Sequence, residues 1–216
     1  MMIKTKQLKV YLAEDHTVVR KGMQRLLSSF DRIGTVKDAA NGKELLTLIE
    51  EDEPDAVILD VEMPVMGGIE AAKIIADRYP AIKILVLTMH NEVVFINKLL
   101  DIGVHGLLSK SAEPLEVETA LDSIVEKDFY QNDMVKNALA NPNDKDSDNK
   151  YCRLTNREIE ILLLICKELT PGEISSRLQI SEKTFFNHRS NILAKTGSRS
   201  NVGLIRYALM KGYFKI

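Results

Sequence analysis

The sequence predicts an α/β protein in which a doubly wound domain of five strands and five helices precedes a smaller all-α domain. Two observations predict this class. Short runs rich in β-branched residues alternate with helix-length amphipathic segments through the first 126 residues, a pattern typical of a parallel sheet covered by helices on both faces. Beyond residue 150 the spacing of apolar residues becomes helical throughout.

The elements of the first domain follow one another in strict alternation. Strands are predicted at 8–13, 35–39, 56–60, 83–88 and 106–109. Helices are predicted at 17–28, 43–51, 68–78, 92–101 and 112–126. Because crossovers between parallel strands are right-handed, few topologies remain open.

A polar stretch separates the two domains. Residues 140–150, ANPNDKDSDNK, contain almost no apolar side chains and many turn-forming residues, which is typical of a solvated linker. We therefore predict a first domain at 1–126, a linker at 127–150 and a second domain at 151–216.

The helices of the second domain carry their own start and stop signals. Thr155 and Glu158 form a predicted capping box for the first helix. Pro171 suits the first turn of a short second helix. Ser181 caps a longer third helix that Gly197 ends, and a fourth is predicted over 201–211.

Charge is divided unevenly between the two domains. Residues 151–216 hold 11 of the 29 lysines and arginines but 5 of the 31 acids, a net charge of +6, which leaves −8 for residues 1–150. A basic C-terminal domain favours an anionic partner. The two cysteines have no metal-ligand or disulfide spacing, and neither a signal peptide nor a membrane span is indicated. We expect a cytoplasmic protein without a membrane partner.

Polar side chains gather at the predicted carboxyl ends of the strands. Glu14 and Asp15 follow the first strand, Asp60 ends the third, Thr88 ends the fourth and Lys110 follows the fifth. Ligands of open parallel sheets bind at this edge. Acids gathered there favour a hard cation such as Mg²⁺, and a lysine beside them favours a phosphoryl group. The simpler alternative is a set of solvated loop acids with one structural salt bridge.

Through these residues, the segment 8–126 resembles the receiver domain of two-component response regulators, which has a (βα)5 flavodoxin-like fold. The resemblance implies that Asp60, in LDVEMPVMGG, accepts a phosphoryl group from a sensor histidine kinase. It implies that Mg²⁺ is held by Asp15, Asp60 and the backbone carbonyl of Glu62, with Glu14 acting through a metal-bound water. Thr88 and Lys110 would then sense the phosphoryl group.

Two features test that resemblance. Haloacid-dehalogenase-type phosphatases also use an aspartyl nucleophile at a strand end, but they need a second aspartate two residues on, where this chain has Glu62. We therefore do not expect an enzyme. Receiver domains usually carry an aromatic switch residue three positions before the lysine, where this chain has Leu107. The sequence therefore predicts phosphorylation of Asp60 but no coupling through a large aromatic ring at residue 107.

Residues 154–214 resemble the LuxR/NarL-type helix-turn-helix, through the LT-RE opening, the EI-S--L-IS--T segment and H--NI--K. The helix after Ser181 would enter the major groove of promoter DNA. The residues expected to face DNA are Lys183, Thr184, Phe186, Asn187, His188, Arg189, Ser190 and Lys195. Phe186 stands where a lysine is usual, and either a thymine contact or core packing would explain it. For His188 a buried, hydrogen-bonded position is the alternative.

The last helix has no evident partner for its whole apolar face. The resemblance implies a dimer contact on DNA through Val202, Ile205, Arg206 and Leu209. The expected function is that of a DNA-binding transcriptional response regulator, in which phosphorylation of Asp60 controls homodimer formation and promoter binding. The alternatives are a regulator that binds DNA without phosphorylation and a protein-interaction module.

Overall fold

The computed structural model describes residues 7–140 and 154–215. The chain divides into two compact units. The first is built from the residues up to Met89 together with Gly106–Val125, and the second from His90–His105 together with the residues from Glu126 onward.

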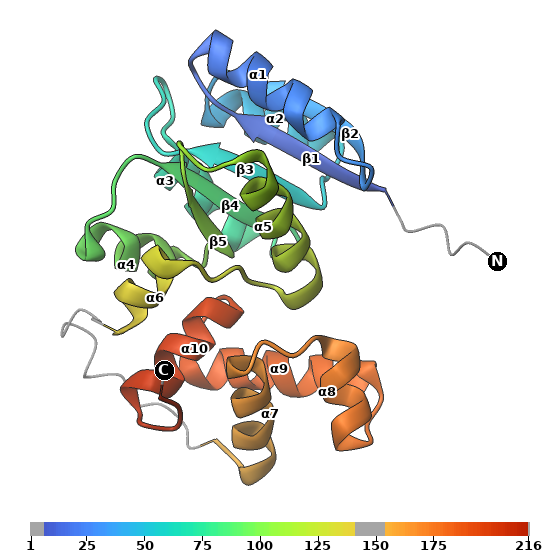
Figure 1. Ribbon diagram of the computed structural model, residues 1–216. Coiled ribbons are helices and arrows are strands. Elements are labelled where there is room, and N and C mark those ends of the chain that lie inside the picture. Colours follow the sequence, from blue (N-terminus) through green and yellow to red (C-terminus); the bar gives the residue numbers. More distant parts are fainter. Residues whose placement is uncertain (1–6, 141–153, 216) are drawn as a thin grey trace. The chain divides into compact units, whose positions relative to one another are not determined.

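The first unit contains a five-stranded parallel sheet in the order β2-β1-β3-β4-β5 (Figure 1). Its strands are β1 (Leu8–Ala13), β2 (Ile33–Ala39), β3 (Ala56–Asp60), β4 (Lys83–Thr88) and β5 (Gly106–Ser109). The doubly wound fold predicted from the sequence is confirmed. The strand order reverses between β1 and β3, and such switch points are where ligands of these folds bind.

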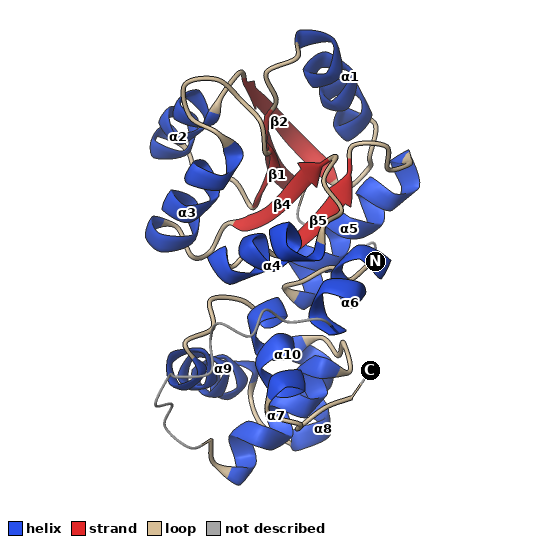
Figure 2. Ribbon diagram, turned by 90° about the vertical axis from the view of Figure 1, so that its left-hand side faces the viewer, coloured by secondary structure: helices blue, strands red, loops and turns tan. Residues whose placement is uncertain are grey.

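Helices cover both faces of the sheet, as Figure 2 shows. The helices α2 and α3 lie on one face and α1 and α5 on the other. Their bounds are α1 (Thr17–Ser28), α2 (Gly42–Glu51), α3 (Gly68–Arg78) and α5 (Pro114–Lys127). Strand β3 between these layers is buried along its whole length, including Asp60 at its end. Because both faces of β3 meet helices, this strand needs a continuous run of apolar residues.

The second unit is helical throughout the residues that the structure describes. It contains α4 (Val93–Ile102), α6 (Asp133–Ala140), α7 (Asn156–Cys166), α8 (Pro171–Leu178), α9 (Glu182–Thr196) and α10 (Asn201–Met210). The predicted capping box of Thr155 and Glu158 is confirmed at the start of α7. Ser181 caps α9, and Gly197 ends it with a left-handed φ of 68°, a conformation that glycine adopts without strain.

Helix α6 was not predicted and falls inside the segment expected to be a linker. Its buried residues Val135, Ala138 and Leu139 are spaced as one face of a helix. The side chain of Asn132 accepts a hydrogen bond from the backbone amide of Val135 at 3.1 Å, which closes its first turn. Eight residues are too few for this pattern to stand out from its polar surroundings. The rest of the expected linker, from residue 141 on, lies outside the described residues.

Glu158 ties two helices of the second unit together. Its carboxylate accepts a hydrogen bond of 2.7 Å from the Thr155 amide and two of 2.7 Å from Lys195 Nζ on α9. Burial acts to raise the pKa of Glu158, but the hydrogen bonds from Lys195 and Thr155 outweigh it and the pKa is lowered. The ionised acid is therefore a stabilising contact between α7 and α9.

We expect Glu158→Gln to lower the free energy of unfolding by about 2 kcal/mol at neutral pH. Because the folded-state pKa lies below 4.5, this contribution is present above that pH and is lost as the pH falls through the folded value. Urea unfolding of the full-length chain, followed by circular dichroism at neutral and acidic pH, measures the difference. A loss of the same size at both pH values would contradict this role.

Candidate functional site

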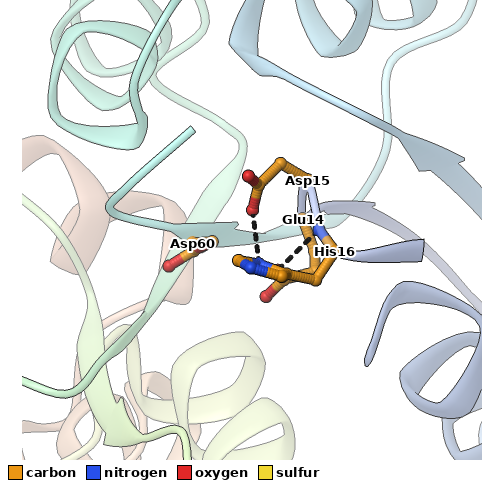
Figure 3. Close-up of side chains that lie close together, drawn as sticks. All are labelled: Glu14, Asp15, His16 and Asp60. Carbon is orange, nitrogen blue, oxygen red and sulfur yellow. Dashed lines mark hydrogen bonds and ion pairs between the residues drawn. The ribbon is translucent and has the colours of Figure 1, made fainter. Parts of the chain in front are cut away.

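Three acids meet at the carboxyl edge of the sheet. Glu14 and Asp15 follow β1, and Asp60 ends β3, whose Leu59 pairs in register with Ala13 of β1. The donor atoms of Glu14, Asp15, His16 and Asp60 all lie within 4.8 Å of one another (Figure 3). The topological switch point thus brings the predicted acids together.

Lys110 neutralises part of this acidic charge. Its Nζ lies 2.7 Å from Oδ2 of Asp60 and 3.0 Å from Oε2 of Glu14. Its backbone amide donates to the carbonyl oxygen of Thr88 at 3.0 Å, which ties the loop after β5 to the end of β4. Thr88 is itself buried, one position beyond Leu87, which pairs with Asp60 in the sheet. Residues at the ends of β1, β3, β4 and β5 therefore meet at the carboxyl edge of the sheet.

The electrostatics of the site reflect burial of charge. Glu14 and Asp60 are each about 1% exposed. Burial raises the pKa of Asp60, and the Lys110 hydrogen bond offsets this only in part while the charge of Glu14 adds to it. Burial acts to lower the pKa of Lys110, but its hydrogen bonds to Asp60 and Glu14 prevail and the pKa is raised.

Several buried carboxylate oxygens of the site have only a shared cation or an imidazole as their partner. Glu14 Oε2 and Asp60 Oδ2 share the ammonium of Lys110, and the buried Oδ1 of Asp15 lies 2.8 Å from Nδ1 of His16. Buried oxygens of this kind are costly unless a cation or a donor reaches them. Closely set carboxylates suit a hard divalent cation.

The loop after Asp60 is shaped by a close backbone approach. The amide of Glu62 donates to Oδ1 of Asp60 at 3.4 Å, and Val65 adopts a left-handed φ of 68°. The amide of Gly68 then donates to the carbonyl of Val61 at 3.0 Å, at the start of α3. A Cβ atom at Gly68 would lie 1.9 Å from the carbonyl oxygen of Asp60. Only glycine allows this turn to close.

Two residues of the site were missed from the sequence. Arg20 on α1 donates from Nη1 to the backbone carbonyls of Glu14 at 2.6 Å and Asp15 at 3.1 Å, and from Nε to Asp38 at 3.1 Å. It fixes the loop that presents both acids. His16 places Nδ1 at 3.1 Å from Glu14 and 2.8 Å from Asp15. Each lies one to five positions after the acid pair, and this proximity was the available signal.

The position where a receiver usually carries an aromatic ring is filled by core packing. Leu107 is fully buried within β5. His105, two positions before Leu107, is 6% exposed, and its Nε2 lies 3.6 Å from Oδ1 of Asp128 in the second unit. The site is therefore not coupled to its surroundings through a large ring at residue 107.

The predicted recognition helix α9 has one buried and one exposed face. Phe185 and Ile192 lie on the buried face. On the other face Phe186 is 48% exposed, which excludes full core packing, and its ring meets that of Phe185 edge-on with 5.3 Å between centroids. The further predicted DNA-facing residues that are exposed are Lys183, Asn187 and Ser190, while Thr184 and His188 are half-buried.

Other residues assigned to DNA or to the dimer have partners within the second unit. Lys195 binds Glu158, and Arg189 pairs with Asp128 and donates to Oδ1 of Asn201 at 2.9 Å. Val202 and Ile205 of α10 are buried, Leu209 is half-buried, and Arg206 pairs with Asp101. The sequence could not reveal these pairings, because it does not show which acids face α9 and α10.

Comparison with known proteins follows the same division of the chain. Residues 10–122 match the response regulator receiver domain, and residues 153–208 match the bacterial regulatory proteins of the luxR family. The chain belongs to the LuxR-type response regulators. This LuxR-type regulator is 32% identical over 207 residues to the response regulator UvrY of Escherichia coli K12, with 95% of each chain covered.

Two further relatives agree. The oxygen regulatory protein NreC of Staphylococcus carnosus is 32% identical over 212 residues, covering 94% of the regulator and 98% of NreC. Among solved structures, the response regulator RcsB in a complex with DNA is 25% identical with a TM-score of 0.58, covering 94% of the regulator and 98% of that chain. Among the described residues of the LuxR-type regulator, no helix has the length and apolar character needed to cross a bilayer.

Proposed function

We propose that Asp60 accepts a phosphoryl group from the histidine of a cognate sensor kinase. The observation that supports this most is the pair of buried carboxylates, Glu14 and Asp60, bridged by one ammonium group at 3.0 and 2.7 Å. The P–N bond of the donor breaks, its electron pair stays on the histidine nitrogen, and a P–O bond forms to the Asp60 carboxylate. Positioning and charge neutralisation supply nearly all the acceleration in such transfers.

Mg²⁺ is the metal that this donor set fits best, since most of its donor atoms are carboxylate oxygens set close together. Asp15, Asp60 and the backbone carbonyl of Glu62 would hold it, with Glu14 acting through a water. When bound, Mg²⁺ neutralises charge on the phosphoryl oxygens. Arg20 keeps the acidic loop in place, and Lys110 stays beside Asp60 to meet the incoming phosphoryl group.

In the proposal, the phosphorylated state is read by Thr88 and Lys110. Two or three charge-assisted hydrogen bonds at ~1.5–3 kcal/mol each give ~5 kcal/mol. That approaches the ~5.5 kcal/mol needed to shift a two-state population from 1:99 to 99:1. The shift would favour a homodimer through α10, by Val202, Ile205, Arg206 and Leu209. Because the first two are buried here, their exposure would have to accompany the shift.

The second unit is proposed to bind double-stranded promoter DNA through α9. A protein with this role would work in the cytoplasm. Asn187 is exposed and can pair with adenine in a bidentate manner. The exposed ring of Phe186 suits a thymine methyl group and carries no charge for phosphate. The remaining proposed contacts to DNA are Lys183, Thr184, His188, Arg189, Ser190 and Lys195. A dimer would read half-sites ~10–10.5 bp apart.

The experiment compares DNA affinity before and after treatment with acetyl phosphate and Mg²⁺. For the wild type we expect phosphate incorporation and tighter binding to promoter DNA, because dimers bind two half-sites at once. Asp60→Ala should bind DNA only at the untreated level, and Asp77→Ala, an exposed acid on α3, should behave as wild type. If the Asp60 variant gained affinity on treatment, the phosphorylation-independent alternative would replace this proposal.

A further inference from the structure

The edge strand β2 carries an acid, Asp38, that lies outside the four-residue cluster around Asp60. In the sheet Asp38 pairs in register with Leu12 of β1. Its side chain is 16% exposed, and it accepts hydrogen bonds of 3.1 Å from Nε of Arg20 and from Nζ of Lys21. Two cations of α1 therefore converge on one carboxylate of β2.

The guanidinium of Arg20 joins this carboxylate to the loop that carries Glu14 and Asp15. Its Nη1 donates to the carbonyl oxygens of Glu14 at 2.6 Å and Asp15 at 3.1 Å, while its Nε donates to Asp38. A guanidinium presents these donors in one rigid plane, whereas the ammonium of a lysine is a single point charge. Asp38 thus sets the orientation of the plane that holds the two carbonyls.

Strand β2 holds the same loop through its backbone as well. The amide of Glu14 donates to the carbonyl oxygen of Ala39, the residue after Asp38, at 3.2 Å. The peptide groups on both sides of Glu14 are therefore restrained. Because a residue has only two soft backbone dihedral angles, these restraints also fix the direction in which the Glu14 side chain leaves the backbone.

Such a restraint matters because the carboxylates of the cluster repel one another. Glu14 is about 1% exposed, and its ligand oxygen lies within 4.8 Å of those of Asp15 and Asp60. Like charges this close are driven apart most strongly where water is excluded. Mg²⁺ demands near-ideal octahedral geometry from its ligands, so a loop free to relax would bind it less tightly.

We propose that Asp38 is a positioning residue for phosphoryl transfer to Asp60, and that it acts through Arg20. The carboxylate of Asp38 holds the guanidinium, the guanidinium holds the carbonyls of the loop, and both loop acids are thereby kept in place. The inference rests on the proposed function, because it concerns the same site. An ion pair that only joins α1 to β2 would contribute to stability and leave the acids unaffected.

Asp38→Asn tests this role, because it keeps the shape of the side chain and removes the charge that holds Arg20. Calorimetric titration of the full-length protein with MgCl₂ should show binding weakened by about 10-fold, as loss of an outer partner of a metal site does. With acetyl phosphate as donor, the Mg²⁺ concentration for half-maximal phosphorylation should rise by the same factor. The rate at saturating Mg²⁺ should stay close to that of wild type, since the acids are then held by the ion.

A double-mutant cycle tests whether Asp38 acts through Arg20. The double variant Arg20→Ala with Asp38→Asn should bind Mg²⁺ no more weakly than Arg20→Ala alone. Arg20→Lys should not restore binding, because one ammonium replaces donors on two nitrogens. Lys21→Ala is the matched control, since Lys21 is 54% exposed and its Nζ binds Asp38 and Gln24. This control should have the Mg²⁺ affinity of wild type.

Hydrogen exchange of the metal-free proteins gives a readout that does not depend on activity. The amide of Glu14 should exchange faster in Asp38→Asn than in wild type or Lys21→Ala. Unchanged Mg²⁺ affinity and unchanged exchange in Asp38→Asn would overturn the inference, even if Arg20→Ala does not fold. Wild type that takes up no phosphate would contradict the proposed function, and the Mg²⁺ affinity and Glu14 exchange of the variants would still decide the inference.

Discussion

Replacing Lys110 with methionine is expected to lower the free energy of unfolding by about 2 kcal/mol in metal-free solution, because it leaves two buried carboxylates without their shared cation. Both carboxylates are about 1% exposed, and Lys110 Nζ lies within 3.0 Å of each. Loss of one partner of a buried pair typically costs ~3–5 kcal/mol. The smaller value is expected here since the side chain of Lys110 is 22% exposed and water reaches it.

Added Mg²⁺ should restore much of this loss, because a dication placed among the same oxygens neutralises them in place of the ammonium. Thermal unfolding with and without MgCl₂ measures the rescue, and the rise in Tm should be larger for Lys110→Met than for wild type. Lys73→Met on α3 is the matched control, as its side chain is exposed. A variant as stable as wild type without metal would show that the ion pair contributes nothing.

The sheet and its polar edge were predictable because both follow from local patterns. Four of the strands lie within the predicted bounds, and β2 only begins two residues earlier, at Ile33. Parallel topology then forces the residues after β1 and at the end of β3 to the same edge. This is why the sequence alone places Asp15, Asp60 and Lys110 together.

Contacts between side chains from distant segments could not be predicted in the same way. Arg20 holds the carbonyls of the acidic loop only because α1 begins in a particular orientation, which no periodicity encodes. Lys195 and Arg189 carry the charge expected of phosphate contacts, yet both face acids inside the second unit. Charge at helical spacing predicts an exposed face, but not which acid a long cation will reach.

Gly68→Ala is expected to be the most destabilising single methyl addition in the first unit, with a loss of roughly 3 kcal/mol or more. The added Cβ would lie 1.9 Å from the carbonyl oxygen of Asp60 and 3.1 Å from Cα of Val61. Both are backbone atoms, so no side-chain rotation relieves the overlap. The turn that follows Asp60 must open, which also moves the carboxylate proposed to accept the phosphoryl group.

Gly22→Ala provides the matched control. Gly22 lies within α1, and an added Cβ there would meet no atom within 4 Å. That change should raise stability by about 0.5–1 kcal/mol, because alanine favours the helix over glycine. Urea unfolding of both variants measures the contrast. The two substitutions add the same methyl group. Changes of opposite sign in the free energy of unfolding would therefore assign the loss at Gly68 to its contact with Asp60. A Gly68→Ala protein as stable as wild type would instead show that the loop can relax around a side chain.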